Sequence, residues 1–130
     1  MIIQANLQFE VVVHIHDETF ESKMLEIIGS KEQGEIKGTI EPLNGKRIYK
    51  VDNADVHGKL HGLNLGFQFY VATIKKCFEL GCTEFRSSTI LNEHSTGVWK
   101  KIQRLYYNCD YIKKTKKDTY YSVCRNKDLL

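Results

Sequence analysis

The most informative segment for the fold is the one in which the hydrophobic pattern changes from that of strands to that of a helix. Residues 57–80 read HGKLHGLNLGFQFYVATIKKCFEL. Glycines punctuate the first half of this segment, whereas the apolar residues of the second half recur at helical spacing: Phe67, Val71, Ile74 and Phe78. Gly81 follows as a helix stop. The segment therefore predicts a glycine-rich loop that leads into a helix over residues 66–80.

Upstream of this loop the sequence predicts strands. Apolar and polar residues alternate over residues 6–16, as they do in a half-buried strand. Asn44-Gly45 is the strongest hairpin signal in the chain. Four strands joined by short turns predict an antiparallel meander. The expected strands are 6–16, 20–29, 35–42 and 46–56, with turns at 17–19 and 31–34.

Downstream of the helix we expect a short strand, a second helix and a closing pair of strands. Asn92 is a suitable N-cap for the second helix. The predicted order is β-β-β-β-α-β-α-β-β, which indicates a single α/β (α+β) domain over residues 1–130, with a mixed, mostly antiparallel sheet and two main helices. The last three strands are expected over 83–89, 105–112 and 119–125, with a turn at 114–117.

The composition is that of one globular domain. The chain has 130 residues and 15.1 kDa, with 42% hydrophobic and 27% charged residues. No stretch approaches the roughly 20 apolar residues that a membrane span needs, and the first residues do not resemble a signal peptide. We therefore expect a soluble, cytoplasmic protein with no membrane partner.

The cysteines are expected to remain thiols, because cytoplasmic proteins rarely keep disulfides. A turn at 114–117 would pair the last two strands so that the numbers of opposite residues sum to about 232. Cys109 and Cys124, whose numbers sum to 233, would then lie nearly opposite each other on neighbouring strands. No Cys-x-x-Cys occurs, and His14 and His16, which share a strand face, have no third ligand nearby in sequence. We therefore expect no metal. The four cysteines are Cys77, Cys82, Cys109 and Cys124.

The glycine-rich loop has the features of an anion site. Glycines let the backbone approach a ligand closely, and the free N–H groups of a helix's first turn favour phosphate or pyrophosphate. A plain strand-to-helix connection would use the same residues. A Walker-type loop is excluded because no Gly-Lys-Ser/Thr follows, and the preceding antiparallel meander argues against a dinucleotide fingerprint.

Several segments, in the right order and at the right distances, resemble the GNAT superfamily of N-acyltransferases. His61-Gly62-Leu63-Asn64-Leu65-Gly66 is similar to its pyrophosphate loop, which usually reads Arg/Gln-x-x-Gly-x-Gly/Ala. Asn92 falls where the family places an asparagine, and the run from Val98 to Ile102 resembles its Val-Tyr/Trp-x-Lys-Leu. The match covers about residues 48–125. In four places the sequence departs: His61 replaces Arg/Gln, Asn64 replaces a glycine, Trp99 stands where a tyrosine often acts as an acid, and Gln103 replaces a common glycine after that helix. The family's first strand and two helices have no counterpart in the pattern.

The resemblance implies direct transfer of an acetyl group from acetyl-CoA to an amine acceptor, without a metal. Such a transfer needs a base for the amine and an acid for the leaving thiolate. From the residues, Asp52 and Asp55 are candidates for the base and Tyr106 for the acid; Glu84, Glu93, Tyr107 and Cys109 are further candidates. The residues that the resemblance implies for the cofactor are Val56, His61, Gly62, Leu63, Asn64, Leu65, Gly66, Asn92 and Trp99.

The charge distribution leaves a second function open. The net charge is +3, but residues 100–130 hold nine Lys or Arg against three Asp, so the first 99 residues carry −3. A basic C-terminal hairpin would suit a catalytically silent module of the same fold that binds nucleic acid or a protein. Lysines on a solvated hairpin are the commoner case, so we expect acyl-CoA and an amine as partners rather than nucleic acid. The acceptor and a homodimer are left open.

Overall fold

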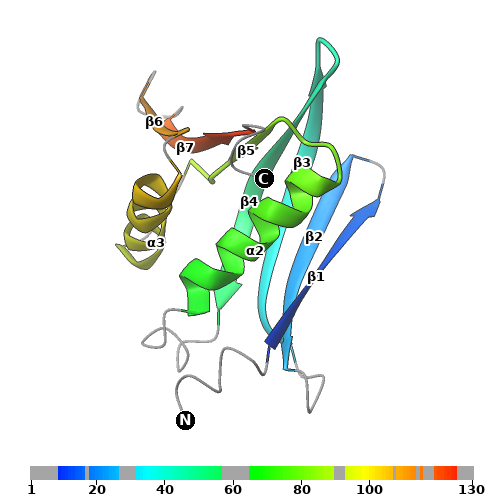
Figure 1. The fold of residues 1–130 in the computed structure, drawn as a ribbon, viewed down its shortest axis with the longest axis vertical. Coiled ribbons are helices and arrows are strands. Elements are labelled where there is room, and N and C mark those ends of the chain that lie inside the picture. Colours follow the sequence, from blue (N-terminus) through cyan, green and yellow to red (C-terminus); the bar gives the residue numbers. More distant parts are fainter. Residues whose placement is uncertain are drawn as a thin grey trace.

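The structure, a computed structural model, describes residues 9–16, 18–26, 32–56, 65–89, 93–106, 108–113, 115 and 119–125. Within these residues the chain forms one seven-stranded sheet with two helices on it (Figure 1). The strand order across the sheet is β1-β2-β3-β4-β5-β7-β6. In chain order, the elements are β1 Phe9–His16, β2 Thr19–Glu26, β3 Glu32–Leu43, β4 Lys46–Val56, α2 Leu65–Glu79, β5 Glu84–Arg86, α3 Glu93–Leu105, β6 Cys109–Lys113 and β7 Thr119–Cys124.

The predicted order of elements and the mostly antiparallel sheet are confirmed, with three corrections to bounds. The turn predicted at 31–34 is wrong for residues 32–34, because β3 already pairs there with β2 and β4. Only residues 84–86 of the strand predicted over 83–89 pair as a strand. The strand predicted from Leu105 begins at Cys109 instead, because the N–H of Tyr106 still donates to the Ile102 carbonyl and so prolongs the helical hydrogen bonding of α3.

Strands β1 to β4 form the predicted antiparallel meander, and its best-defined turn is Asn44-Gly45. Both residues have positive φ, 51° and 79°, as a tight hairpin requires. A bulge later in the same pair shifts the register between Lys37 and Gly38, so that Asp52 of β4 has no residue opposite it. The bulge therefore changes how the end of β4 presents its side chains.

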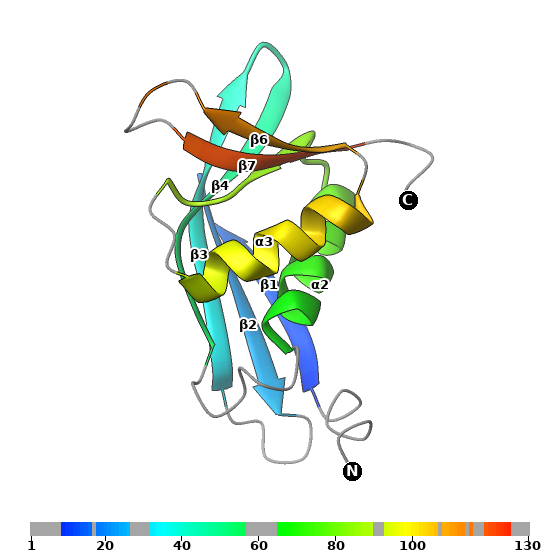
Figure 2. The same ribbon diagram turned by 90° about the vertical axis from the view of Figure 1, so that its left-hand side faces the viewer.

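Helix α2 covers one face of the meander, and α3 packs beside α2 (Figures 1 and 2). The apolar stripe predicted for α2 is buried at Ile74 and Phe78, which are 0% and 1% exposed. Trp99 of α3 is completely buried among the rings of Tyr70, Phe85 and Tyr121, with centroids 5.3, 6.2 and 5.8 Å away. This aromatic group joins α2, α3 and the β5–β7 end of the sheet into one core.

A chain of hydroxyl groups ties α2 to β2 inside this core. The Thr73 hydroxyl donates to the Phe69 carbonyl at 2.8 Å, and the Ser22 and Thr73 hydroxyl oxygens lie 2.7 Å apart. Since the Thr73 proton is already used, Ser22 is the donor in the second bond. Both side chains are fully buried, so the Ser22 hydroxyl depends on Thr73 for its hydrogen bond, whereas Thr73 also bonds the Phe69 carbonyl.

The four cysteines are free thiols, and their positions explain why Cys109 and Cys124 are unbridged. Cys109 lies opposite Val123 and Asp110 opposite Ser122, so the predicted register is confirmed. Cys124 is one residue further along β7 and therefore faces the other side of the sheet. Accordingly, Cys109 is buried and Cys124 is exposed. Burial raises the pKa of Cys77 and of Cys109 to about 12, and raises that of Cys82 as well.

Replacing Thr73 by Val removes the shared hydroxyl while keeping the side chain's shape. We expect Thr73→Val to lower the free energy of unfolding by about 1–3 kcal/mol, because the Ser22 hydroxyl is then buried without a partner. The double variant Ser22→Ala, Thr73→Val should lose less than the two single variants added together, since both partners are gone. Urea titrations of the four proteins measure this, and strictly additive losses would contradict the buried pair.

The cysteine positions predict thiol reactivity. In the folded protein one thiol, Cys124, should react rapidly with an aromatic disulfide reagent, and three more should appear only on unfolding. A pH increase from 7 to 9 should not release the three slow thiols, because a thiol with a pKa of about 12 stays neutral over that range. In the matched variant Cys124→Ser the rapid phase should vanish. If fewer than four thiols react in denaturant without reductant, the result would contradict the assignment of all four cysteines as free thiols.

Candidate functional site

The most distinctive feature of the sheet is the separation of β4 and β5. These parallel strands pair only at Ile48–Lys50 with Glu84–Arg86. Beyond that point β4 continues to Val56, while the chain after β5 turns to β7. There the Ser87 N–H donates to the Tyr121 carbonyl, and the Tyr121 N–H donates to the Ser87 hydroxyl, both at 2.9 Å. Within the described residues, no strand pairs with residues 51–56 of β4 on the β5 side.

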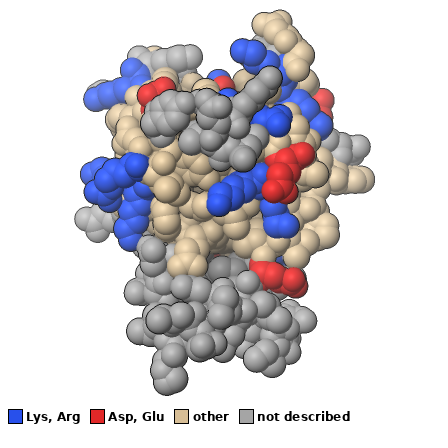
Figure 3. Space-filling view, viewed as in Figure 1, with Lys and Arg blue, Asp and Glu red and all other residues tan. Residues whose placement is uncertain are grey.

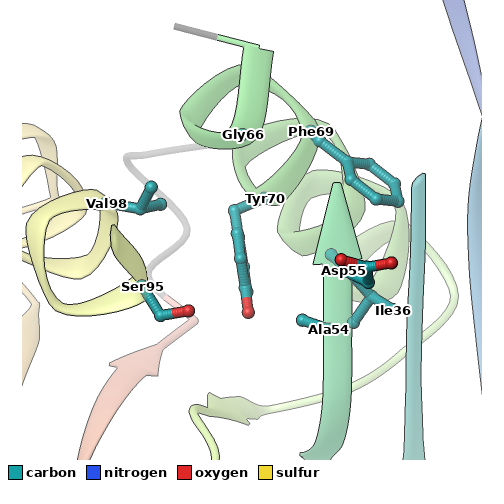
Figure 4. A pocket seen from close by; sticks show the side chains of 8 residues that line it. All are labelled: Ile36, Ala54, Asp55, Gly66, Phe69, Tyr70, Ser95 and Val98. Atoms are coloured by element: carbon teal, nitrogen blue, oxygen red, sulfur yellow. The ribbon is translucent and has the colours of Figure 1, made fainter. Parts of the chain in front are cut away.

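A small cavity lies beside this free part of β4, between the strand and both helices (Figure 4). Its enclosed part is about 20 Å³, enough for one water molecule or one small chemical group. Its walls are mostly apolar. The lining residues are Ile36 of β3, Ala54 and Asp55 of β4, Gly66, Phe69 and Tyr70 of α2, and Ser95 and Val98 of α3.

Three polar side chains belong to this lining: Asp55, Tyr70 and Ser95. The Tyr70 ring extends from α2 so that its hydroxyl lies between Ser95 and Ala54 (Figure 4). Tyr70 is only 5% exposed, and burial raises its pKa to about 12, so the phenol is neutral at pH 7. Asp55 is exposed to solvent. The site thus combines a carboxylate that solvent reaches with a buried neutral donor.

The start of α2 adds an anion-binding element to the same cavity. Leu65 and Gly66 are the first two residues of the helix, and Gly66 is buried in the cavity wall. No acidic side chain occupies the first turn. The free N–H groups of a helix's first turn favour a negatively charged ligand. The end of β4, the cavity and the start of α2 are therefore neighbours.

The predicted cofactor residues fall into three groups. Gly66 lines the cavity, and Val56 and Leu65 lie at the end of β4 and the start of α2. Trp99 has no exposed surface, so it offers nothing to a ligand in this structure. The remaining five, His61, Gly62, Leu63, Asn64 and Asn92, lie outside the described residues, and their roles stay predictions.

Of the predicted catalytic residues, only Asp55 lines the cavity. Asp52 accepts a hydrogen bond from Thr39 at 2.7 Å and lines a hollow on the opposite face of the sheet, because it alternates with its buried neighbour Val51. Tyr106 lies just after α3 and is 6% exposed. Its hydroxyl meets no hydrogen-bonding partner in the described part of the chain, and burial raises its pKa. Neither Asp52 nor Tyr106 is brought to the cavity.

Sequence reasoning did not single out Tyr70 and Ser95 as site residues. Tyr70 follows Gly66 by four positions, which is one helical turn, so both residues lie on one face of α2. Ser95 precedes Val98 by three positions, and both face the cavity from α3. This spacing was the available signal. It could not be used without knowing which face of each helix borders the free edge of β4.

The hollow on the opposite face is larger, about 390 Å³, and open. As predicted, His14 and His16 share that face. Among the residues that the structure describes, no group of three His, Cys, Asp or Glu side chains is arranged to hold a metal ion. No described helix is both long and apolar enough to cross a membrane.

The basic C-terminal hairpin is only partly described. Lys114, Lys116, Lys117 and Lys127 lie outside the described residues, so the prediction of a binding surface there stays untested. On the face seen in Figure 3, the described Lys and Arg side chains form separate groups, with uncharged, acidic and undescribed residues between them.

No protein-family model and no curated protein sequence matches this chain. Several solved structures do match. The ribosomal-protein-S5-alanine acetyltransferase of Vibrio fischeri has a TM-score of 0.63 at 14% identity, over 85% of this chain and 63% of that one. Glucosamine-6-phosphate N-acetyltransferase of Arabidopsis thaliana gives 0.54 at 15% identity, over 66% and 59%. The PaiA N-acetyltransferase of Thermoplasma acidophilum, solved with coenzyme A, gives 0.56 at 11% identity, over 83% and 62%.

The chain thus spans about three-fifths of the length of these three acetyltransferases. At identities of 11–15% the likeness concerns the fold alone. It agrees with the resemblance that the motifs indicated. The chain has the fold of the GNAT acetyltransferases.

Proposed function

We propose that this protein is an N-acetyltransferase that uses acetyl-CoA and acts on an amine by direct transfer. The observation that carries the proposal is the free part of β4 next to a helix whose second residue is a buried glycine, with a cavity between them. The structures of similar fold support acetyl transfer in general, and one of them was solved with coenzyme A.

The chain offers a separate contact for each part of acetyl-CoA. The first-turn N–H groups of α2 suit the pyrophosphate, and a side chain at Gly66 would obstruct it. The edge of β4 over residues 51–56 can hydrogen-bond the amides of the pantetheine arm as a strand partner would. The cavity at the end of this path accepts a group no larger than the thioester head. A ligand along this route would contact Val56, Leu65 and Gly66, three of the residues that the resemblance implies for the cofactor.

The chemistry is one of addition and elimination at the thioester carbon. The amine nitrogen forms a bond to the carbonyl carbon, the oxygen takes up negative charge, and the C–S bond then breaks. The amine loses one proton, and the leaving thiolate takes up one. We assign the base to Asp55, the acidic residue among those that line the cavity, because its exposed carboxylate is open to an amine that arrives from solvent.

Replacing Gly66 by Val should weaken acetyl-CoA binding by at least about tenfold, because a branched side chain fills the space next to the first-turn N–H groups. The matched control is Gly97→Val, since Gly97 also lies inside a helix and a Cβ added there meets nothing within 4 Å. It should bind as the wild type does. Calorimetric titration measures both.

Acetyl-CoA should also raise the melting temperature of the wild type, because a ligand that binds only the folded state stabilises it. A wild type without binding at millimolar acetyl-CoA would contradict the proposal and favour the silent binding module. Equal affinity in Gly66→Val would contradict the placement of the pyrophosphate.

The two aspartates of β4 give a direct test of the base. Asp55→Asn should reduce kcat by about 10²–10⁴-fold, the usual contribution of a general base, without weakening acetyl-CoA binding. Asp52→Asn should stay within threefold of the wild type, because Asp52 faces the other side of the sheet. Steady-state rates with a panel of amines measure both, and a larger loss in Asp52→Asn would reverse the assignment.

A further inference from the structure

The cavity lining contains two hydroxyl groups that the reaction outlined above does not use, those of Tyr70 and Ser95, and the Tyr70 hydroxyl belongs to the more buried residue. Tyr70 is 5% exposed, and its hydroxyl points toward Ala54 of β4 and Ser95 of α3 at the cavity (Figure 4). The Trp99 side chain hydrogen-bonds the phenol and partly offsets the effect of burial on its pKa. Because an indole N–H only donates, the phenol's own proton is left to point where the thioester head would lie.

The position of this hydroxyl is fixed by packing. The Tyr70 ring contacts Trp99 edge to face, with centroids 5.3 Å apart and planes at 66°. Trp99 is itself completely buried and stacks against Tyr121. The backbone that carries Tyr70 is held by the hydrogen bond from Thr73 to Phe69. A donor held in this way loses little entropy when it meets a developing charge.

We propose that the Tyr70 hydroxyl donates a hydrogen bond to the thioester carbonyl oxygen and to the oxyanion that forms from it. This inference rests on the proposed function and adds a catalytic residue to it. The bond is a hydrogen bond throughout: Tyr70 keeps its proton, and the balance of bonds and protons in the transfer is unchanged.

A role as the acid for the leaving thiolate fits the site less well. Burial raises the pKa of Tyr70 to about 12, whereas an ordinary thiol has a pKa of about 8.5, so transfer of the phenol proton to a thiolate is strongly unfavourable. A neutral donor among apolar walls strengthens its bond as the oxygen becomes negative, which is how an oxyanion is stabilised. Ser95, the other hydroxyl in the lining, is more exposed than Tyr70.

The test compares Tyr70→Phe with Tyr121→Phe. Each variant removes one hydroxyl from a nearly buried tyrosine that packs against Trp99, but Tyr121 does not line the cavity. Tyr70→Phe should reduce kcat by about 10²–10³-fold, the loss seen when one oxyanion donor is removed. Its acetyl-CoA affinity by calorimetry should stay within threefold, and Tyr121→Phe should match the wild type in both.

A second readout needs no acceptor amine. Infrared difference spectra of bound acetyl-CoA, labelled with ¹³C at the thioester carbonyl, should show a lower C=O frequency in the wild type and Tyr121→Phe than in Tyr70→Phe. Equal frequencies, or an unchanged kcat in Tyr70→Phe, would overturn the role of Tyr70 while leaving the proposed function standing. A wild type that does not bind acetyl-CoA would instead overturn the proposed function itself, and the role of Tyr70 with it.

Discussion

The short parallel pairing between β4 and β5 determines how the two parts of the sheet and the two helices are arranged. Three residue pairs, Ile48–Lys50 with Glu84–Arg86, join the four-stranded meander to the β5-β7-β6 end of the sheet. Phe85 at its centre is completely buried. Glu84 bonds both Arg86 and Ser122 of β7. Burial by itself would raise the pKa of Glu84, but these partners hold it below its ordinary value. The junction is therefore strong but short, and beyond it the strands separate.

The two helices form the other walls of the cavity beside the part of β4 that β5 leaves free. Helix α2 crosses the meander and is tied to β2 by the Ser22–Thr73 pair, which places its first turn beside the end of β4. Helix α3 closes the other side of the cavity with Ser95 and Val98. Trp99 holds the two helices together through Tyr70. The same tryptophan that supports the core thus fixes the orientation of the one buried hydroxyl in the site.

The residues that bear on catalysis differ in how far the sequence could locate them. Asp52 and Asp55 were both named as candidate bases because they lie near the end of the fourth predicted strand. The structure places Asp55 in the lining of the cavity and Asp52 in the hollow of the opposite face, and the role of each as a base stays a prediction. Tyr106 was placed in a strand, whereas it lies just after the end of α3, away from the cavity.

The order of the elements, the Asn44-Gly45 hairpin, the register of the last two strands and the resemblance to the acetyltransferase fold could all be read from the sequence. These follow from local rules: hydrophobic period, turn chemistry and the spacing of residues along one segment. Three features became visible only in the folded chain: the point where β4 leaves β5, the burial of Trp99, and the direction of the Tyr70 side chain. These depend on contacts between residues far apart in the chain, such as Tyr70 with Trp99 and Tyr121 with Ser87, whose geometry packing alone fixes.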